Sequence, residues 1–595
     1  MNSTHVSTHS APVSEHRTFI FISAIAVVLG VISSFVAQAL TRLIGLVTNL
    51  SFYGRISTEF VSPAGNHLGA WVIVVPVIGG LLVGLMARYG SKAIRGHGIP
   101  EAMEQVLENH SRIPARIVLL KPISAAISIG TGGPFGAEGP IIATGGAIGS
   151  LLGQILSTTA AERKTLLAAG AAAGMAAIFG SPISAVLLAV ELLLFEFRPR
   201  SVVPVALAAA TAAGMRIHFE GAEAIFAMPA LAPVSLTALG FYALIGIAMG
   251  VLAVGVTRAV YWIEDAFELL PIHWMWWPAI GAVAVGVIGW FAPRTLGVGY
   301  TNISDILCNR LPLNAIAFLC VMKFISWAIS LGSGTSGGTL APLLTIGSGA
   351  GNVLGAFLLT LFPASGLDVR VASLLGMAAV FAGASRALLA SVVFAFETTL
   401  QPNGLLPLLA GSALAFLTAR MLMKNSIMTE KIARRGLKIP DDFEADVFHQ
   451  ATVAQLMDTQ IRTLGATTTV GELAERISRH DPEISAYQAW PLVDAAGQLA
   501  GIVTRHDLLR SLGNSEASLS YIGSTRLVTA YPEESMHDAV ARMLQHGVGR
   551  LLVVDRSDAK KLVGYLSRTS LLSTRMRSLH HEHTRDDGWW RSFRK

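Results

Sequence analysis

The chain has 595 residues, of which 52% are hydrophobic and 14% are charged. The charged share is about half of that usual in soluble proteins, which excludes a wholly soluble chain and predicts a multi-pass membrane protein. The formal net charge is +6, with basic clusters at 431–435 and 575–595. Such clusters beside membrane segments predict cytoplasmic anchors, with no nucleic-acid partner. The two cysteines exclude a disulfide framework and a cysteine-based metal site.

Changes in composition along the chain predict its domain organisation. Residues 1–17 are polar and predict a disordered cytoplasmic arm, whereas 18–438 are a succession of apolar segments. A linker at 439–450 leads into a region of soluble composition, and 576–595 form a basic tail. The expected fold is an all-α polytopic membrane domain with broken helices, followed by a soluble α/β module.

Several apolar segments are shorter than the roughly 20 residues that a straight membrane crossing needs, and many contain glycine and proline. In a bilayer, such breaks are tolerated only where the backbone is buried in protein or lines a wet cavity. Two breaks correspond to each other: 130–136 leads into a helix at 138–140, and 330–338 leads into a helix at 339–342. Paired breaks in two halves of a chain indicate a transport site near the membrane midplane.

Glu138 is the only charged residue between Lys121 and Glu162. It lies at the expected N-terminus of a helix, where unpaired backbone N–H groups carry partial positive charge and bind anions. Its carboxylate can occupy the position of an anion and be displaced by a permeant anion or by protonation, which makes it a predicted gate. The alternative is a buried acid satisfied by neighbouring donors for stability alone. The cost of an unpaired intramembrane carboxylate favours the gate.

The soluble region contains two similar copies of alternating helices and strands. The first copy predicts one helix and two strands, in the order 469–476, 489–494 and 499–503. The second predicts the same order at 535–544, 550–555 and 562–566. Each copy closes on a polar turn before a short helix.

Four short motifs carry a resemblance to a known family: Gly96–Pro100 (GHGIP), Gly136–Pro140 (GAEGP), Gly338–Pro342 (GTLAP) and Ser426–Met428 (SIM). On these motifs, residues 20–438 resemble the CLC family of chloride channels and chloride/proton antiporters. The resemblance implies a homodimer whose subunits each have an anion path built from an inverted repeat. It also implies chloride as the transported substrate and no required cofactor. The soluble copies, 451–513 and 524–575, resemble a pair of CBS motifs.

The resemblance also implies an anion-binding set, made of His97, Gly98, Ile99, Gly136, Ala137, Gly139, Thr339, Leu340, Ala341 and Met428. The family usually has a serine and a tyrosine in place of His97 and Met428, and their hydroxyls donate to the central anion. Methionine offers no donor, whereas histidine offers an N–H group and can gain charge near neutral pH. Alternatively, His97 turns away and hydrogen-bonds locally. The transported anion therefore stays open between chloride, bicarbonate, nitrate and other small anions.

Proton coupling depends on a second departure from the family. Leu192 stands where the resemblance places an internal proton-transfer glutamate, and leucine cannot carry a proton. This favours channel-like chloride conduction, gated by voltage or pH and regulated by the CBS pair. The alternative is a chloride/proton antiporter in which Glu191, Glu196 or His97 serves on the proton path. A second alternative is a nonconducting membrane sensor of nucleotides, which the doubled glycine breaks disfavour. No enzyme is expected, since no nucleophile–base pair or metal set converges in the apolar body.

Paired CBS modules in this family can hold an adenine nucleotide, with a threonine or serine on phosphate and an aspartate on ribose. Thr504 and Asp507 fit this pattern, whereas the second copy ends at Thr569 and Ser570 without an acid. The sequence therefore predicts one half-site for ATP or AMP. The alternative is a dimerisation module without a ligand. The expected location is the lipid bilayer of the inner or plasma membrane, with the CBS module and both termini in the cytoplasm.

Overall fold

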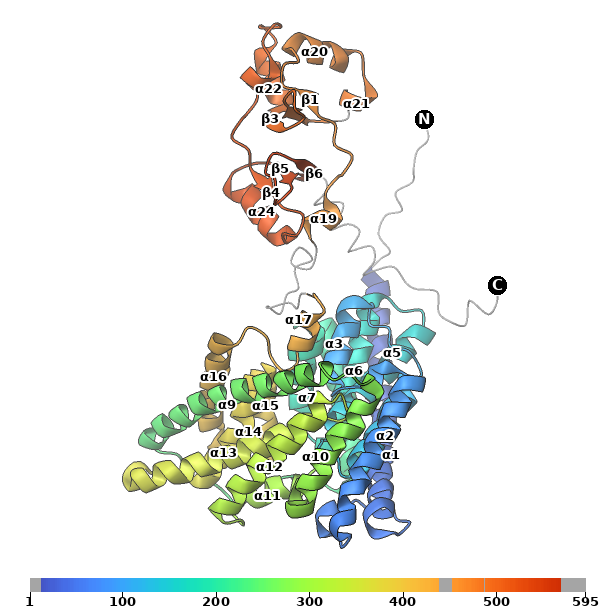
Figure 1. Ribbon diagram of the computed structural model, residues 1–595, viewed down its shortest axis with the longest axis vertical. Helices are drawn as coiled ribbons and strands as arrows, with labels where there is room; N and C mark the ends of the chain where they lie inside the picture. The colour runs from blue at the N-terminus through green and yellow to red at the C-terminus, as the bar shows by residue number, and fades with distance from the viewer. Residues whose placement is uncertain (1–11, 438–451, 486, 569–595) are drawn as a thin grey trace, which may run out of the picture. The chain divides into compact units, whose positions relative to one another are not determined.

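The computed structural model describes residues 12–437, 452–485 and 487–568. It divides the chain into two compact units, and the boundary falls between Ile439 and Pro440 (Figure 1). This boundary coincides with the start of the predicted linker at 439–450. The linker itself, the tail at 576–595, Thr569 and Ser570 lie outside the described residues.

The first unit is helical. Its first half contains α1 (Pro12–Tyr53), α2 (Val74–Tyr89), α3 (Ile99–Glu108), α4 (Ile117–Gly130), α5 (Glu138–Ile155), α6 (Ala160–Phe179), α7 (Pro182–Ala189), a π-helical turn η4 (Val190–Leu194) and α8 (Pro199–Glu220). Its second half contains α9 (Leu236–Glu268), α10 (Trp277–Phe291), α11 (Tyr300–Leu307), α12 (Leu313–Gly332), α13 (Leu340–Leu361), α14 (Val369–Ser385), α15 (Leu388–Thr399), α16 (Leu405–Leu422) and the short α17 (Glu430–Arg434).

Eight helices within the described part of the chain are long and apolar enough to cross a membrane. Four further segments in the described chain, α4, α7 with η4, α14 and α15, are shorter apolar helices, as the interrupted sequence predicts. One boundary differs from the prediction: α1 begins at Pro12, so residues 12–17 are helical instead of belonging to the polar arm.

The two halves repeat one arrangement of helices. Helix α5 packs on α6 as α13 packs on α14, and α6 packs on α8 as α14 packs on α16. Likewise, α1 packs on α8 as α9 packs on α16. The repeat expected from the paired breaks is therefore present over sixteen helices of the described chain.

The two glycine-rich breaks are joined to each other. The N–H group of Gly136 donates to the carbonyl of Gly338 at 3.2 Å, and the N–H group of Gly338 donates to the carbonyl of Gly136 at 2.9 Å. A second bridge connects Gly96 with Ser336. A Cβ atom at Gly139 would lie only 2.1 Å from the carbonyl oxygen of His97. This close approach of three backbone segments requires glycine.

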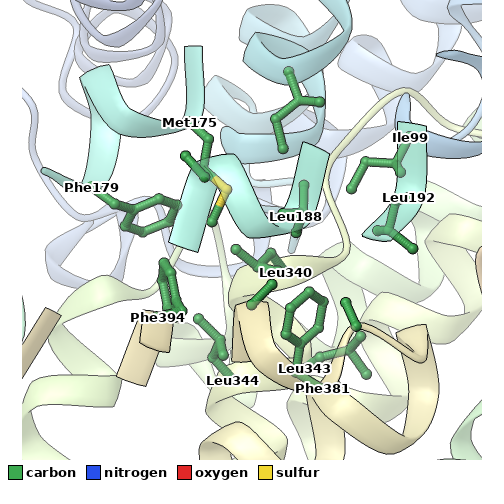
Figure 2. Close-up of a cluster of buried hydrophobic side chains, with 14 of the residues drawn as sticks. Ile99, Met175, Phe179, Leu188, Leu192, Leu340, Leu343, Leu344, Phe381 and Phe394 are labelled. Atoms are coloured by element: carbon green, nitrogen blue, oxygen red, sulfur yellow. The ribbon is translucent and has the colours of Figure 1, made fainter. Parts of the chain in front are cut away.

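Both halves contribute to a buried apolar cluster (Figure 2) that includes Ile99 and Leu340, which directly follow glycine-rich segments. Side chains from α3, α6, α7, η4, α13, α14 and α15 meet there: Ile99, Met175, Phe179, Leu188, Leu192, Leu340, Leu343, Leu344, Phe381 and Phe394. Well-packed apolar side chains of this kind hold the half-helices in fixed positions, so that their N-termini stay aligned.

The second unit contains two small mixed sheets. The first copy consists of α19 (Val453–Leu456), β1 (Leu464–Gly465), α20 (Val470–Ser478), α21 (Pro482–Ser485), β2 (Ala489–Val493), β3 (Leu499–Thr504) and α22 (Arg505–Ser511). The second consists of α23 (Leu519–Ile522), β4 (Thr529–Ala530), α24 (Met536–Gln545), β5 (Arg550–Val554) and β6 (Leu562–Ser567). In each sheet a parallel pair precedes an antiparallel pair, with Trp490 opposite Val503 and Leu551 opposite Leu566. The predicted order of helices and strands is confirmed in both copies.

Candidate functional site

Glu138 is the first residue of α5, and its side chain is fully buried. The Tyr300 hydroxyl donates to its Oε1 atom at 2.8 Å. The backbone N–H groups at the starts of α5 and α13, those of Glu138 and Ala341, also interact with the carboxylate. The other oxygen, Oε2, makes no hydrogen bond of normal geometry with the described residues. One oxygen is thus fixed and the other is available to a ligand or a proton.

The free oxygen lies in the gap between the two breaks. A Cβ atom at Gly136 would be 1.6 Å from Oε2, and one at Gly338 would be 3.0 Å from it. The carboxylate therefore occupies space that only glycines leave open. This is the position in which a tethered anion would block a path lined by helix N-termini.

Most of the predicted anion-binding residues lie at the starts of α3, α5 and α13. Gly98 and Ile99 begin α3, the segment from Gly136 to Gly139 begins α5, and the segment from Thr339 to Ala341 begins α13. Together with His97 and Met428 they are all buried. The Thr339 hydroxyl is a second buried polar group without a hydrogen-bond partner among the described residues.

His97 and Met428 occupy the two positions at which the family usually has a serine and a tyrosine. His97 is 5% exposed, and its Nδ1 atom makes no hydrogen bond with the described residues. The local hydrogen bond that would turn the ring away is therefore not seen at Nδ1. Its charged neighbours are Glu101, Lys431 and Lys121. Met428 is fully buried, and its thioether supplies no donor.

Two buried lysines support the loops that precede α3 and α11. Lys121 Nζ donates to the carbonyls of Ile94 and Gly96, at 2.9 and 2.8 Å. Lys323 Nζ donates to the carbonyls of Thr295 and Gly297, at 3.0 and 2.8 Å. Both lysines are at most 1% exposed. Each lysine fixes a Gly-X-Gly loop and places a positive charge near the breaks, which favours an anion there.

Tyr300, the hydrogen-bond donor to Glu138, was not predicted. A signal for it exists, because Gly297-Val298-Gly299 repeats the pattern of Gly96-His97-Gly98, and each pattern begins a short helix. Tyr300 is thus the counterpart of Ile99 in the second half. Only the fold shows that its side chain reaches a carboxylate 162 residues away in the chain.

The two acids proposed for the proton path, Glu191 and Glu196, lie on one segment together with Leu192. Glu191 accepts hydrogen bonds from the N–H groups of Leu389 and Ala390, both at 3.0 Å, at the start of α15. Glu196 accepts from the Ser201 hydroxyl at 2.6 Å, and its side chain is 18% exposed. Leu192 is 3% exposed and belongs to the apolar cluster (Figure 2). Both acids are partly exposed, but only Glu191 caps a helix among the described residues.

A cavity of about 90 Å³ lies on the other side of Tyr300. Its lining includes Ile44 and Thr48 of α1, the loop at 60–63 and the segment from Gly297 to Thr301. Tyr300 is therefore part of the cavity wall and also a hydrogen-bond partner of Glu138.

Thr504 and Asp507 lie together in the second unit. The N–H group and the hydroxyl of Thr504 donate to Asp507 Oδ2 at 2.9 and 2.6 Å, and the Asp507 N–H group donates to Thr504 Oγ1 at 3.2 Å. This is a capping box at the start of α22. The same atoms would have to exchange partners in order to bind phosphate and ribose.

Broken helices whose N-termini face a buried carboxylate define the first unit as a membrane anion transporter. A sequence model described as "Voltage gated chloride channel" matches residues 79–420, and one described as "CBS domain" matches 453–514 and 519–577. The chain belongs to the CLC family of voltage-gated chloride channels and transporters, and it carries two CBS domains.

Individual relatives agree with this assignment. The chain is 26% identical over 585 residues to "Chloride channel protein CLC-f" of Arabidopsis thaliana, covering 84% of this chain and 73% of the relative. It is 29% identical over 421 residues to "H(+)/Cl(-) exchange transporter ClcA" of Vibrio campbellii, covering 67% of this chain and 89% of the relative. A solved eukaryotic CLC transporter superposes with a TM-score of 0.61 at 20% identity, covering 93% of this chain and 98% of that structure. This last likeness concerns the fold alone.

Proposed function

We propose that this protein exchanges chloride or a similar small anion for protons across a membrane. The observation that carries the proposal is the buried Glu138 carboxylate at the meeting point of the half-helices, with Oε2 unpaired. Protonation of a titratable group in the anion path frees its place for an anion, so the proton flux and the anion flux become linked. The relatives named as H(+)/Cl(−) exchange transporters support exchange over the channel-like conduction that Leu192 favours.

The residues around the gate suggest how a cycle would run. With Glu138 ionised, its free oxygen fills the gap between Gly136 and Gly338 and excludes an anion. Protonation removes the charge that the helix N-termini attract. The side chain can then leave, and an anion takes its place near Thr339, whose hydroxyl has no partner among the described residues.

Channel-like conduction remains the second candidate, because the inner half of a proton path is incomplete. Leu192 is buried in the apolar cluster, and Glu191 is engaged at the N-terminus of α15. Exchange therefore requires Glu196 or another group to bring protons from the inner face.

Reconstituted vesicles distinguish these functions. The purified protein is placed in vesicles loaded with chloride, the membrane potential is clamped, and proton movement is followed with a pH dye. Exchange predicts that outward chloride flow drives protons inward, and that Glu138→Ala abolishes proton movement while chloride flow continues. Chloride flow without proton movement in the unmodified protein supports the channel. No anion flow at any pH or voltage supports the nonconducting sensor.

We further propose that the end of the membrane unit at α17 faces the cytoplasm, in the inner or plasma membrane. Basic residues gather there: Lys431 pairs with Glu101 at 2.7 Å, and Arg435 pairs with Glu104. An excess of basic residues marks the cytoplasmic side of membrane proteins. We also propose the family's homodimer as the working assembly and an adenine nucleotide as a regulatory ligand of the CBS pair.

A further inference from the structure

We infer that Tyr300 is a positioning residue that holds the gate closed through its hydrogen bond to Glu138. This inference rests on the proposed transport function and adds a residue to its gate. The hydroxyl donates to Oε1 at 2.8 Å. A donor on one carboxylate oxygen fixes the rotation of the group, and this directs Oε2 into the gap between the glycine breaks.

The ring of Tyr300 is held by aromatic neighbours on several sides. Its centroid lies 5.8 Å from that of Phe179 and 6.1 Å from that of Phe226, both in edge contacts, and 6.4 Å from that of Phe60 in a stacked contact. Tyr300 is also the first residue of α11, and Lys323 fixes the loop before this helix by donating to the carbonyl of Gly297. The hydroxyl is therefore held in place by packing and does not need Glu138 to position it.

Comparison of the two halves shows that this contact is specific to one of them. In the repeat, Tyr300 corresponds to Ile99, and Glu138 corresponds to Leu340. Ile99 and Leu340 are apolar and lie in the cluster of Figure 2. The fold itself therefore accepts an apolar pair at this place, so stability alone does not require a hydroxyl and a carboxylate there.

Tyr300 also lines the cavity of about 90 Å³ whose wall includes 60–63 and 297–301. For Glu138 to move toward that cavity, its hydrogen bond to Tyr300 must break. The Tyr300–Glu138 hydrogen bond thus opposes displacement of the Glu138 side chain while the carboxylate is ionised, because a hydrogen bond to a charged acceptor is strong in a buried site.

The test is a double-mutant comparison of initial chloride efflux from vesicles at clamped potential. Tyr300→Phe keeps the ring and removes the hydroxyl. We expect efflux to rise by about tenfold, the factor that corresponds to loss of one hydrogen bond to a charged group. In a Glu138→Ala background, Tyr300→Phe should leave chloride efflux unchanged, because the carboxylate that accepts the hydrogen bond is absent.

Tyr53→Phe is the matched control. Tyr53 donates its hydroxyl to the Ser62 carbonyl at 2.6 Å, beside the same cavity, and does not touch the gate. Each variant must elute as the same species as the unmodified protein before reconstitution. Equal efflux from Tyr300→Phe and the unmodified protein overturns the inference about Tyr300. The same holds if Tyr300→Phe changes efflux equally in the unmodified and the Glu138→Ala backgrounds. Absence of anion flux from the unmodified protein instead overturns the proposed function.

Discussion

At the scale of single residues, the protein differs from the family pattern at two of the predicted anion-binding positions. His97 and Met428 replace two hydroxyl groups, and the structure leaves His97 Nδ1 buried without a partner among the described residues. A buried polar atom without a hydrogen bond is rare in folded proteins and often marks the place of a ligand. His97 and the Thr339 hydroxyl are therefore the two side chains best placed to contact an anion.

We expect His97→Ser to change the order of anion preference or its pH dependence, because the substitution replaces a titratable N–H donor with a neutral hydroxyl. The measurement is flux of chloride, nitrate and bicarbonate through reconstituted protein between about pH 4 and 8, a range that covers a buried as well as an exposed histidine. His67→Ser, at an exposed histidine, is the control. An unchanged anion order and pH profile in His97→Ser would remove His97 from the site.

At the scale of the elements, the glycine breaks allow three helix N-termini to approach one another. Their sequence pattern predicted the gate and the anion-binding segments. The pattern did not identify Tyr300 or Lys323, because their contacts join segments far apart in the chain. Two features could have found them: the repeated Gly-X-Gly pattern, and a lysine about 25 residues after each pattern.

Gly139→Ala should destabilise the membrane unit. A Cβ atom there would lie 2.1 Å from the backbone oxygen of His97, and overpacking of this kind costs about 1–3 kcal/mol or more. Gly214→Ala in α8 meets no atom within 4 Å, so it should be neutral or stabilise by up to about 1 kcal/mol. Thermal unfolding in detergent checks both. Equal melting temperatures for the two variants would contradict the close approach at Gly139.

Two reciprocal caps connect α7 and α15. Glu191 accepts from N–H groups at the start of α15, and Glu397 accepts from Ile183 and Ser184 at the start of α7, at 3.0 and 2.8 Å. This symmetry indicates that Glu191 has the same structural task as Glu397. Glu196 takes no part in these two caps, and its side chain is partly exposed.

Glu191→Gln and Glu397→Gln should therefore lower stability by a similar amount, about 1 kcal/mol, and leave the ratio of protons to anions unchanged. Glu196→Gln should lower proton coupling with little loss of stability. Thermal unfolding together with proton uptake in vesicles separates the two effects. Loss of coupling in Glu191→Gln alone would assign the proton path to Glu191 instead.

At the scale of the whole molecule, composition predicted two units, and the repeat in each was visible in the sequence. The soluble copies were predicted because their strands are short apolar runs between polar turns, which is typical of small buried sheets. What the sequence left open is the task of Thr504 and Asp507. In the structure they cap α22, which accounts for both residues without a ligand.

A comparison of two caps tests the nucleotide proposal. Thr504→Ala and Thr469→Ala each remove a capping box, at α22 and α20, and each should cost about 1 kcal/mol. If a nucleotide binds at Thr504, ATP or AMP should raise the melting temperature of the full-length protein and of Thr469→Ala, but not of Thr504→Ala. No thermal shift in the unmodified protein would favour a module without a ligand.

The contact between Tyr300 and Glu138 also makes the two halves of the repeat chemically different. Its counterpart, Ile99 and Leu340, cannot hydrogen-bond through side chains, so the two membrane faces are chemically unequal although the backbone repeats. A pH step on one face should therefore change the flux by a different amount from the same step on the other face. In vesicles with randomly inserted protein, an external pH step would then act unequally on the molecules of the two orientations.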